Sequence, residues 1–163
     1  MNAPLRSPLK FDVQGLVQAM VHNQTNDRLS CTLTTAQWDM LASYMQPFAL
    51  AQGQVLIEQG AADRTLYLLE SGSLSVHYED DKGRVRLAIV APGSAVGEGA
   101  FFTHSPRNAT VQAAAPCKVW CLTPIRFAEL SNRHPTIALE LAMALGSLLG
   151  RRLVNKPKRV AVT

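Results

Sequence analysis

The stretch GEGAFFTHSPRNATV, residues 97–111, places Glu98 and Arg107 nine residues apart around an apolar turn. Its glycines allow another molecule to lie close to the backbone. A helical turn opening near Ala100 would add unpaired backbone N–H groups, which attract anions. An arginine guanidinium can hold two phosphate oxygens at once, whereas a glutamate carboxylate only accepts hydrogen bonds and therefore suits a hydroxyl. The stretch predicts a pocket for a molecule that carries an anion beside a sugar hydroxyl.

A surface ion pair is the alternative explanation for these two charges. Such a pair in an exposed loop contributes at most about 1 kcal/mol and needs no ligand. Considered alone, Glu98 and Arg107 fit both explanations equally well. The flanking glycines, the Ala-Thr-Val end of the stretch and the strands predicted around it favour ligand binding.

Short runs rich in β-branched and aliphatic residues surround this stretch, separated by breaks that contain glycine. Within one run, Leu74, Val76 and Tyr78 alternate with polar residues, as in a half-buried strand. The sequence EDDKGR after this run predicts a hairpin in which Gly83 takes a positive φ. Several short strands at regular spacing indicate a small antiparallel sandwich or barrel. The predicted strand-forming runs are residues 53–60, 65–78, 84–93 and 117–122.

Helices are predicted at both ends of the chain. Ser7 and Pro8 can begin an amphipathic helix, Thr34 and Gln37 form a possible capping box, and Thr123 can cap a helix that starts with Pro124. These helices would cover residues 7–24, 34–45, 123–130 and 135–155. We therefore expect an N-terminal helical extension, a β domain with C-terminal helices, and a basic tail, over residues 1–33, 34–155 and 156–163.

The stretch 97–111 resembles the phosphate-binding cassette of cyclic nucleotide-binding domains, as found in cAMP receptors and in the regulatory subunits of cAMP-dependent protein kinase. Residues 55–76 resemble the early strands of that family, and residues 117–130 with the long helix after them resemble its last strand and its B and C helices. The resemblance covers roughly residues 34–154. It implies an α+β, mainly β fold: an antiparallel β-barrel or jelly roll flanked by N-terminal helices and by the B and C helices.

The resemblance also implies a role for each residue of the cassette. Arg107 would hold the cyclic phosphate and Glu98 the ribose 2′-hydroxyl. The other residues of the implied ligand-binding set are Gly97, Gly99, Ala100, Asn108 and Ala109.

Two of these residues depart from the family pattern. Gly99 stands where the family usually has leucine or another larger residue. Asn108 stands where alanine or serine is common in cAMP binders and threonine in many cGMP binders. The resemblance favours cAMP over cGMP, and another ligand such as a cyclic dinucleotide stays open.

The function that follows is that of a sensor that binds a cyclic nucleotide and catalyses nothing. We expect no catalytic residue, no metal site and no cofactor. Rearrangement of the long C-terminal helix would carry the signal to an unknown protein partner or to a second copy of the chain, bound through residues 136–154. Two alternatives stay open: a protein-docking module of the same fold without a nucleotide, and the sensor half of a transcription regulator that lacks its DNA-binding domain.

The charge of the chain is unevenly distributed. The net charge is +4, but five positive charges lie within residues 151–159, so the rest of the chain is close to neutral. This does not indicate a nucleic-acid-binding surface over the whole fold. The residues after the long helix are too few for a helix-turn-helix module, so we expect no DNA binding by this chain alone. Arg151 and Arg152 are interpreted as complementing the negative end of the helix dipole, with the steering of an acidic partner as an alternative.

The three cysteines are few and odd in number, which favours a reducing compartment over a disulfide framework. Cys117 and Cys121 would lie about 13 Å apart along a strand, too far to share a metal or a disulfide, so we interpret them as structural. The chain has no apolar run of membrane-spanning length and no secretory signal pattern, so we expect a cytoplasmic protein with no membrane partner.

Overall fold

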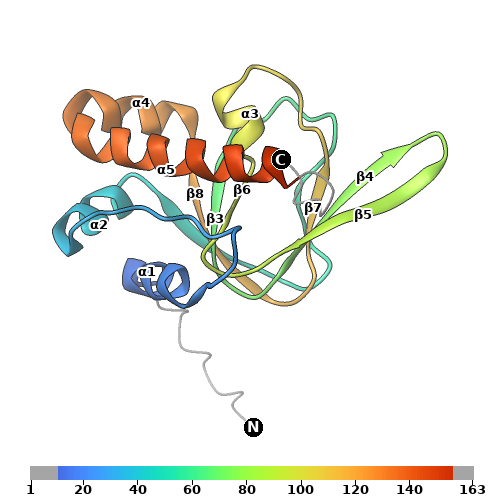
Figure 1. Ribbon diagram of the computed structural model, residues 1–163, viewed down its shortest axis with the longest axis horizontal. Coiled ribbons are helices and arrows are strands. Elements are labelled where there is room, and N and C mark those ends of the chain that lie inside the picture. The colour runs from blue at the N-terminus through green and yellow to red at the C-terminus, as the bar shows by residue number, and fades with distance from the viewer. Residues whose placement is uncertain (1–10, 156–163) are drawn as a thin grey trace, which may run out of the picture.

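The computed structural model describes residues 11–155 and folds as two four-stranded antiparallel sheets (Figure 1). The first sheet has the order β1 (Gln46–Leu50), β8 (Cys117–Leu122), β3 (Leu66–Ser71) and β6 (Ala95–Val96). The second has the order β2 (Val55–Ile57), β7 (Thr110–Ala113), β4 (Leu74–Asp80) and β5 (Gly83–Val90). The prediction of a mainly β, jelly-roll-like fold is confirmed, with two packed sheets in place of a closed barrel.

The first sheet separates two hydrophobic cores because side chains alternate across a strand. On β3 and β8, Leu69 and Val119 belong to the core between the two sheets, which also contains Val76 of β4. Their neighbours Leu68 and Trp120 belong to the core between the first sheet and the helices. One sheet therefore supports both the second sheet and the helical layer.

The helical layer consists of α1 (Val13–His22), α2 (Thr35–Ala42), α4 (Pro124–Arg133) and α5 (Pro135–Val154), while α3 (Glu98–Phe102) is a single turn within the predicted cassette. α1 contacts β3, and α4 packs along α5 (Figure 1). α1 approaches closely: a side chain at Gly93, before β6, would lie 2.5 Å from the carbonyl oxygen of Ala19. The N-terminal helix thus shares its core with the C-terminal helices.

Most of the predicted helix starts agree with the structure. Thr34 and Gln37 form the predicted capping box of α2, and Thr123 caps α4 with Pro124 in its first turn. α2 ends at Ala42, three residues earlier than predicted. The prediction that α1 begins near Pro8 is wrong for the described part of the chain, because residues 11 and 12 are not helical and Asp12 caps Val13. Residues 7–10 and the predicted basic tail lie outside the described residues.

The predicted hairpin joins β4 and β5, and Gly83 at its turn has a φ of 121°. Leu74 and Val76 are buried as predicted, but Tyr78 is 41 % exposed. Figure 1 shows the reason: the hairpin extends well beyond the rest of the second sheet.

α5 buries one side and exposes the other. Ile137, Leu141, Leu145 and Leu148 lie in the core beneath it, whereas Leu139 and Met143 are exposed. Within residues 11–155, no helix combines the length and apolar character needed to cross a membrane.

Candidate functional site

The cassette begins where β6 ends. Gly97 has a φ of 85° and forms the N-cap of α3. A β-carbon at this position would lie 2.7 Å from both Arg107 Nη1 and the carbonyl oxygen of Thr65, so only glycine allows Arg107 to lie here. At the other end of α3, Arg64 donates hydrogen bonds to the carbonyl oxygens of Ala100, Phe101 and Thr103.

Arg107 lies in the interior beside Gly97. Its side chain is 1 % exposed. Nη1 donates to the carbonyl oxygen of Gly97 at 3.1 Å, and Nη2 donates to the carbonyl oxygen of Thr65 at 2.6 Å and to Asp63 Oδ2 at 2.7 Å. Among the described residues, buried Nε has no hydrogen-bond partner. An unsatisfied buried donor is costly, which makes Nε a candidate contact for an acceptor oxygen that is not part of the chain.

Asp63 supplies the negative charge next to Arg107. Desolvation raises the pKa of Asp63, but hydrogen bonds from Arg107 and Thr65 and the charge of Arg107 outweigh it and lower the pKa below its usual value. Because the Asp63 side chain is 52 % exposed, solvent screens much of this interaction. Asp63 therefore orients Arg107 at the surface end of its guanidinium.

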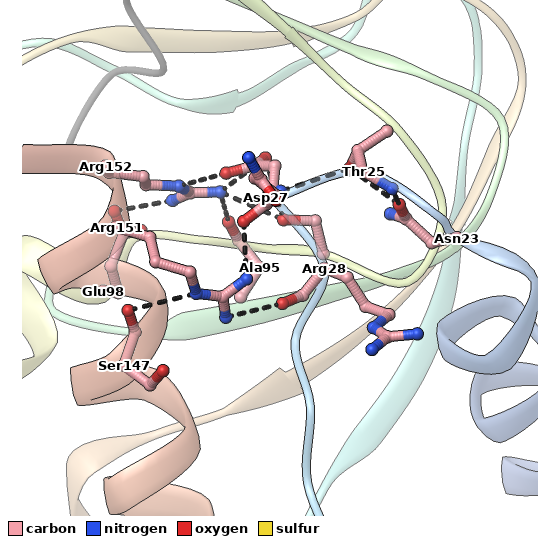
Figure 2. Close-up of polar contacts among 11 residues, drawn as sticks. Asn23, Thr25, Asp27, Arg28, Ala95, Glu98, Ser147, Arg151 and Arg152 are labelled. Carbon is pink, nitrogen blue, oxygen red and sulfur yellow. Dashed lines mark hydrogen bonds and ion pairs between the residues drawn. The ribbon is translucent and has the colours of Figure 1, made fainter. Parts of the chain in front are cut away.

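Glu98 is completely buried at the first position of α3. Its Oε1 accepts a hydrogen bond of 2.7 Å from Nη1 of Arg152, in the last turn of α5. The same guanidinium donates to both carboxylate oxygens of Asp27, to Ser94 Oγ and to the carbonyl oxygen of Ala95 (Figure 2). We refer to Asp27, Ser94, Ala95, Glu98 and Arg152 as the Arg152 cluster.

The Arg152 cluster corrects the interpretation that Arg152 simply complements the negative end of the helix dipole: it lies in the last turn of α5, but its side chain pairs with Asp27 and Glu98. Arg152 is 2 % exposed. Burial alone would lower its pKa, but the charges of Glu98 and Asp27 and their hydrogen bonds raise it, so the guanidinium stays charged inside the protein. The alternative of a surface ion pair for Glu98 and Arg107 is also wrong, because both side chains are buried.

The other predicted site residues fall into two groups, one in α3 and one just before β7. Gly99 and Ala100 are buried in α3, next to Glu98. Ala109 points into the core between the sheets, and Asn108 is exposed just before β7. The backbone of Gly97 joins the first group to Arg107, and the assignment of all seven residues to a ligand stays a prediction.

A family model described as the cyclic nucleotide-binding domain matches residues 47–134, more than half of the chain, and includes both Glu98 and Arg107. The chain belongs to the cyclic nucleotide-binding domain family. It is 39 % identical over 80 residues to the acetyltransferase Pat of Mycolicibacterium smegmatis, across 49 % of this chain and 24 % of that protein. It is 30 % identical over 128 residues to a cAMP-dependent protein kinase regulatory subunit of Blastocladiella emersonii, across 78 % of this chain and 31 % of that protein.

A solved cyclic nucleotide-binding domain from Methylobacillus flagellatus has the same fold, with a TM-score of 0.78, 22 % identity and coverage of 91 % of this chain and 85 % of that chain. The chain spans less than a third of the length of the acetyltransferase and of the kinase regulatory subunit. The shared region is therefore the cyclic nucleotide-binding domain, a ligand-binding regulatory domain, and not the whole of either relative.

Sequence reasoning missed three residues of this cyclic nucleotide-binding domain that hold the cassette: Asp27, Asp63 and Arg152. Asp27 and Arg152 are separated from Glu98 by 71 and 54 residues, and nothing in the local pattern connects them. The one available signal was the pair of arginines at the end of an apolar helix, which indicated positive charge but no partner.

The three cysteines form no disulfide among the described residues and are buried or half-buried, and their structural role stays a prediction. Burial raises the pKa of the Cys31 thiol to about 12, with a further contribution from Glu140, and burial also raises the pKa values of Cys117 and Cys121. Thiols of this kind stay protonated at neutral pH and are poor nucleophiles and metal ligands. No group of histidine, cysteine or acidic residues within residues 11–155 could hold a metal ion.

A separate open hollow of about 600 Å³ lies over the second sheet and is lined by Ser75, His77, Arg84 and Arg86, among others. Burial lowers the pKa of His77, and the positive charges of Arg84 and Arg86 lower it further. Both arginines are exposed to solvent, in contrast to Arg107. The cassette remains the better candidate site of this domain.

Proposed function

We propose that the chain is a cyclic-nucleotide sensor that binds cAMP in the cassette, with cGMP as the less favoured ligand. The observation that carries this proposal is the buried guanidinium of Arg107, whose Nε lacks a partner within the described part of the chain. A phosphate oxygen at Nε would satisfy this donor with a charge-assisted hydrogen bond. The family to which the chain belongs supports the same ligand class.

Each cassette residue has a role in this proposal. Arg107 holds the cyclic phosphate, and Glu98 accepts a hydrogen bond from the ribose 2′-hydroxyl. Gly97, Gly99 and Ala100 provide backbone contacts to the ligand. Because Arg107 and Glu98 are both buried, their interactions with a ligand would be weakened little by solvent.

The preference for cAMP rests on one relative. Asn108 does not contribute to it, because the family resemblance associates alanine or serine at this position with cAMP binders and threonine with many cGMP binders. The relative from Blastocladiella emersonii is named a cAMP-dependent regulatory subunit. Neither the relative nor the fold supplies the contact to the base.

The signal would leave the site through α5. α3 contacts α5, and the last turn of α5 reaches Glu98 through Arg152. A ligand that displaces α3 or Glu98 therefore changes the packing of α5, to the extent that it binds one arrangement better than the other. Binding without catalysis is sufficient for this role.

We also propose that a second copy of the chain, bound through residues 136–154, responds to the changed packing of α5. Leu139 and Met143 are 61 % and 66 % exposed on α5, and β-carbons at Gly146 and Gly150 would meet open space. These four positions follow a seven-residue repeat, which is the spacing of a helix–helix seam. Light scattering at tens of micromolar should give the mass of a dimer, and a monomer would exclude this contact.

Isothermal titration of the purified chain with cAMP and cGMP, alongside the variant Arg107→Ala, tests the sensor function. The wild type should bind cAMP more tightly than cGMP. Arg107→Ala should weaken binding at least about thirtyfold, because it removes a charged hydrogen-bonding partner worth at least about 2 kcal/mol. The matched control is Arg84→Ala, which removes an exposed arginine of the second sheet and should leave affinity unchanged.

The absence of binding to the wild type would favour the nucleotide-free docking module. One observation supports that alternative: Glu98 and both terminal nitrogens of Arg107 already have partners within the protein. Melting temperatures that do not change with excess cAMP and cGMP would support it further.

A further inference from the structure

The Arg152 cluster places a cation at the carboxylate that the ligand would use. Nη1 of Arg152 lies 2.7 Å from Oε1 of Glu98, and both side chains are at most 1 % exposed. A carboxylate offers about four acceptor positions on its two oxygens, and the guanidinium fills one of them on Oε1. A ligand hydroxyl that donates at this position must displace Arg152.

We propose that Arg152 competes with the ligand hydroxyl for Glu98, and that Asp27 sets the strength of this competition. Asp27 and Arg152 are then positioning residues that determine ligand affinity without belonging to the cassette. This inference rests on the proposed function, because it assumes that the ligand hydroxyl binds Glu98.

Contacts other than the one with Arg152 also hold Asp27 in place. It lies in the loop between α1 and α2, and Ser94 Oγ donates to its Oδ2 at 3.0 Å. The loop is attached to the segment before β6 at two further points. Asn23 Nδ2 donates to the carbonyl oxygen of Pro92 at 2.9 Å, and the backbone N–H of Leu29 donates to the carbonyl oxygen of Gly93, also at 2.9 Å. Asp27 therefore presents a rigid acceptor to α5.

The geometry of the guanidinium couples Asp27 to Glu98. Nε and Nη2 of Arg152 donate to the two oxygens of Asp27 at 2.6 and 3.0 Å, while Nη1 donates to Glu98. A guanidinium is a rigid plane, so it cannot turn Nη1 away from Glu98 and keep the other two nitrogens in place. Its contacts with Glu98 and Asp27 break together, and weakening either one makes Glu98 more accessible.

Arg151 provides a matched control on the same turn of α5. Nη1 and Nη2 of Arg151 donate to the carbonyl oxygens of Asn26 and Arg28, on either side of Asp27 (Figure 2). Arg151 thus connects the same helix to the same loop, and its described contacts are to backbone carbonyls of the loop and of Ser147. A variant of Arg151 loosens the helix–loop contact without removing the cation at Glu98.

The test is isothermal titration of the wild type, Asp27→Asn, Arg152→Gln and Arg151→Gln with cAMP and with 2′-deoxy-cAMP. The deoxy nucleotide lacks the hydroxyl that would displace Arg152. Asp27→Asn and Arg152→Gln should bind cAMP about fivefold or more tightly than the wild type, within the usual range of coupling between sites. The gain should be clearly smaller for 2′-deoxy-cAMP, and Arg151→Gln should match the wild type with both nucleotides.

Unchanged or weaker cAMP binding by Asp27→Asn, or equal gains for the two nucleotides, would overturn the competition and leave the sensor function intact. If none of the four proteins bound either nucleotide, the sensor function itself would be contradicted, and the competition with it. Arg152→Gln leaves buried Glu98 without a cation and can fail to fold. In that case Asp27→Asn decides the outcome. This variant should fold, because the Asp27 side chain is partly exposed and Arg152 can still pair with Glu98.

Discussion

Two buried arginines contact the cassette, Arg107 from within it and Arg152 from α5, and they differ in how completely the protein satisfies them. Arg152 has partners for all three nitrogens and two carboxylates within reach. Arg107 has one carboxylate, on a half-exposed side chain, and its buried Nε lacks a partner within the described chain. A fully paired buried arginine holds structural elements together, whereas an incompletely paired one is suited to hold a ligand.

The comparison also separates two ways of positioning a charge. Arg107 is positioned mainly by the backbone carbonyls of Thr65 and Gly97, which lie just before β3 and just after β6, with Asp63 at the surface end of its guanidinium. Arg152 is positioned mainly by acidic side chains from two distant segments. Substitutions at the two sites should therefore differ in their cost to stability.

The largest effect is expected from Arg152→Met. It leaves Glu98, which is completely buried, without its cation, and breaking a buried pair in this way costs about 3–5 kcal/mol. Urea denaturation should measure this loss. The double variant Glu98→Gln, Arg152→Met should lose less than the sum of the two single variants, because the buried charge is absent. A decrease in the free energy of unfolding by less than about 1 kcal/mol would mean that water solvates Glu98 when Arg152 is removed.

A smaller effect is expected from Gly97→Ala, which acts on the other arginine. The substitution introduces strain at a φ of 85° and places a β-carbon 2.7 Å from Arg107 Nη1, at a total cost of about 3 kcal/mol. Gly60→Ala is the control, because Gly60 has the same φ but nothing within 4 Å of its β-carbon. It should cost about 1 kcal/mol. Equal losses in thermal or urea unfolding would mean that Arg107 moves aside at no cost.

The smallest effect is expected from Asp63→Asn and concerns pH. The folded-state pKa of Asp63 is lowered, so its contribution is present above the unfolded-state pKa and is lost as the pH falls through the folded value. With half of the side chain exposed, this contribution is a few tenths of a kcal/mol. The stability of the variant should fall less steeply than that of the wild type below about pH 4. Parallel curves would show that Asp63 adds nothing to the folded state.

The features that sequence reasoning predicted are those encoded over a few residues. The capping box of Thr34, the turn at Gly83 and the start of α4 at Pro124 each depend on neighbours within one turn. The same local reasoning began α1 too early, since Pro8 resembles a helix start as closely as Asp12 does.

The features that it missed depend on packing between distant segments. Arg152 shows only a positive charge in sequence, and its partners become visible once α5 lies across β6 and the loop after α1. Asp63 likewise has no sequence relationship to Arg107, 44 residues later. Tyr78 fits the strand pattern, but the hairpin carries it beyond the second sheet.

The ion pair between Asp27 and Arg152 joins residues that are 125 positions apart, nearly the full length of the described chain. Closing so long a loop has a large entropic cost, so this contact should form late in folding, after the sheets have brought the two segments together. Its loss should in turn be the first step of unfolding at this end of the molecule. The last turn of α5 and the loop around Asp27 should therefore exchange their amide hydrogens as one cooperative unit, at a lower opening free energy than β3 and β8.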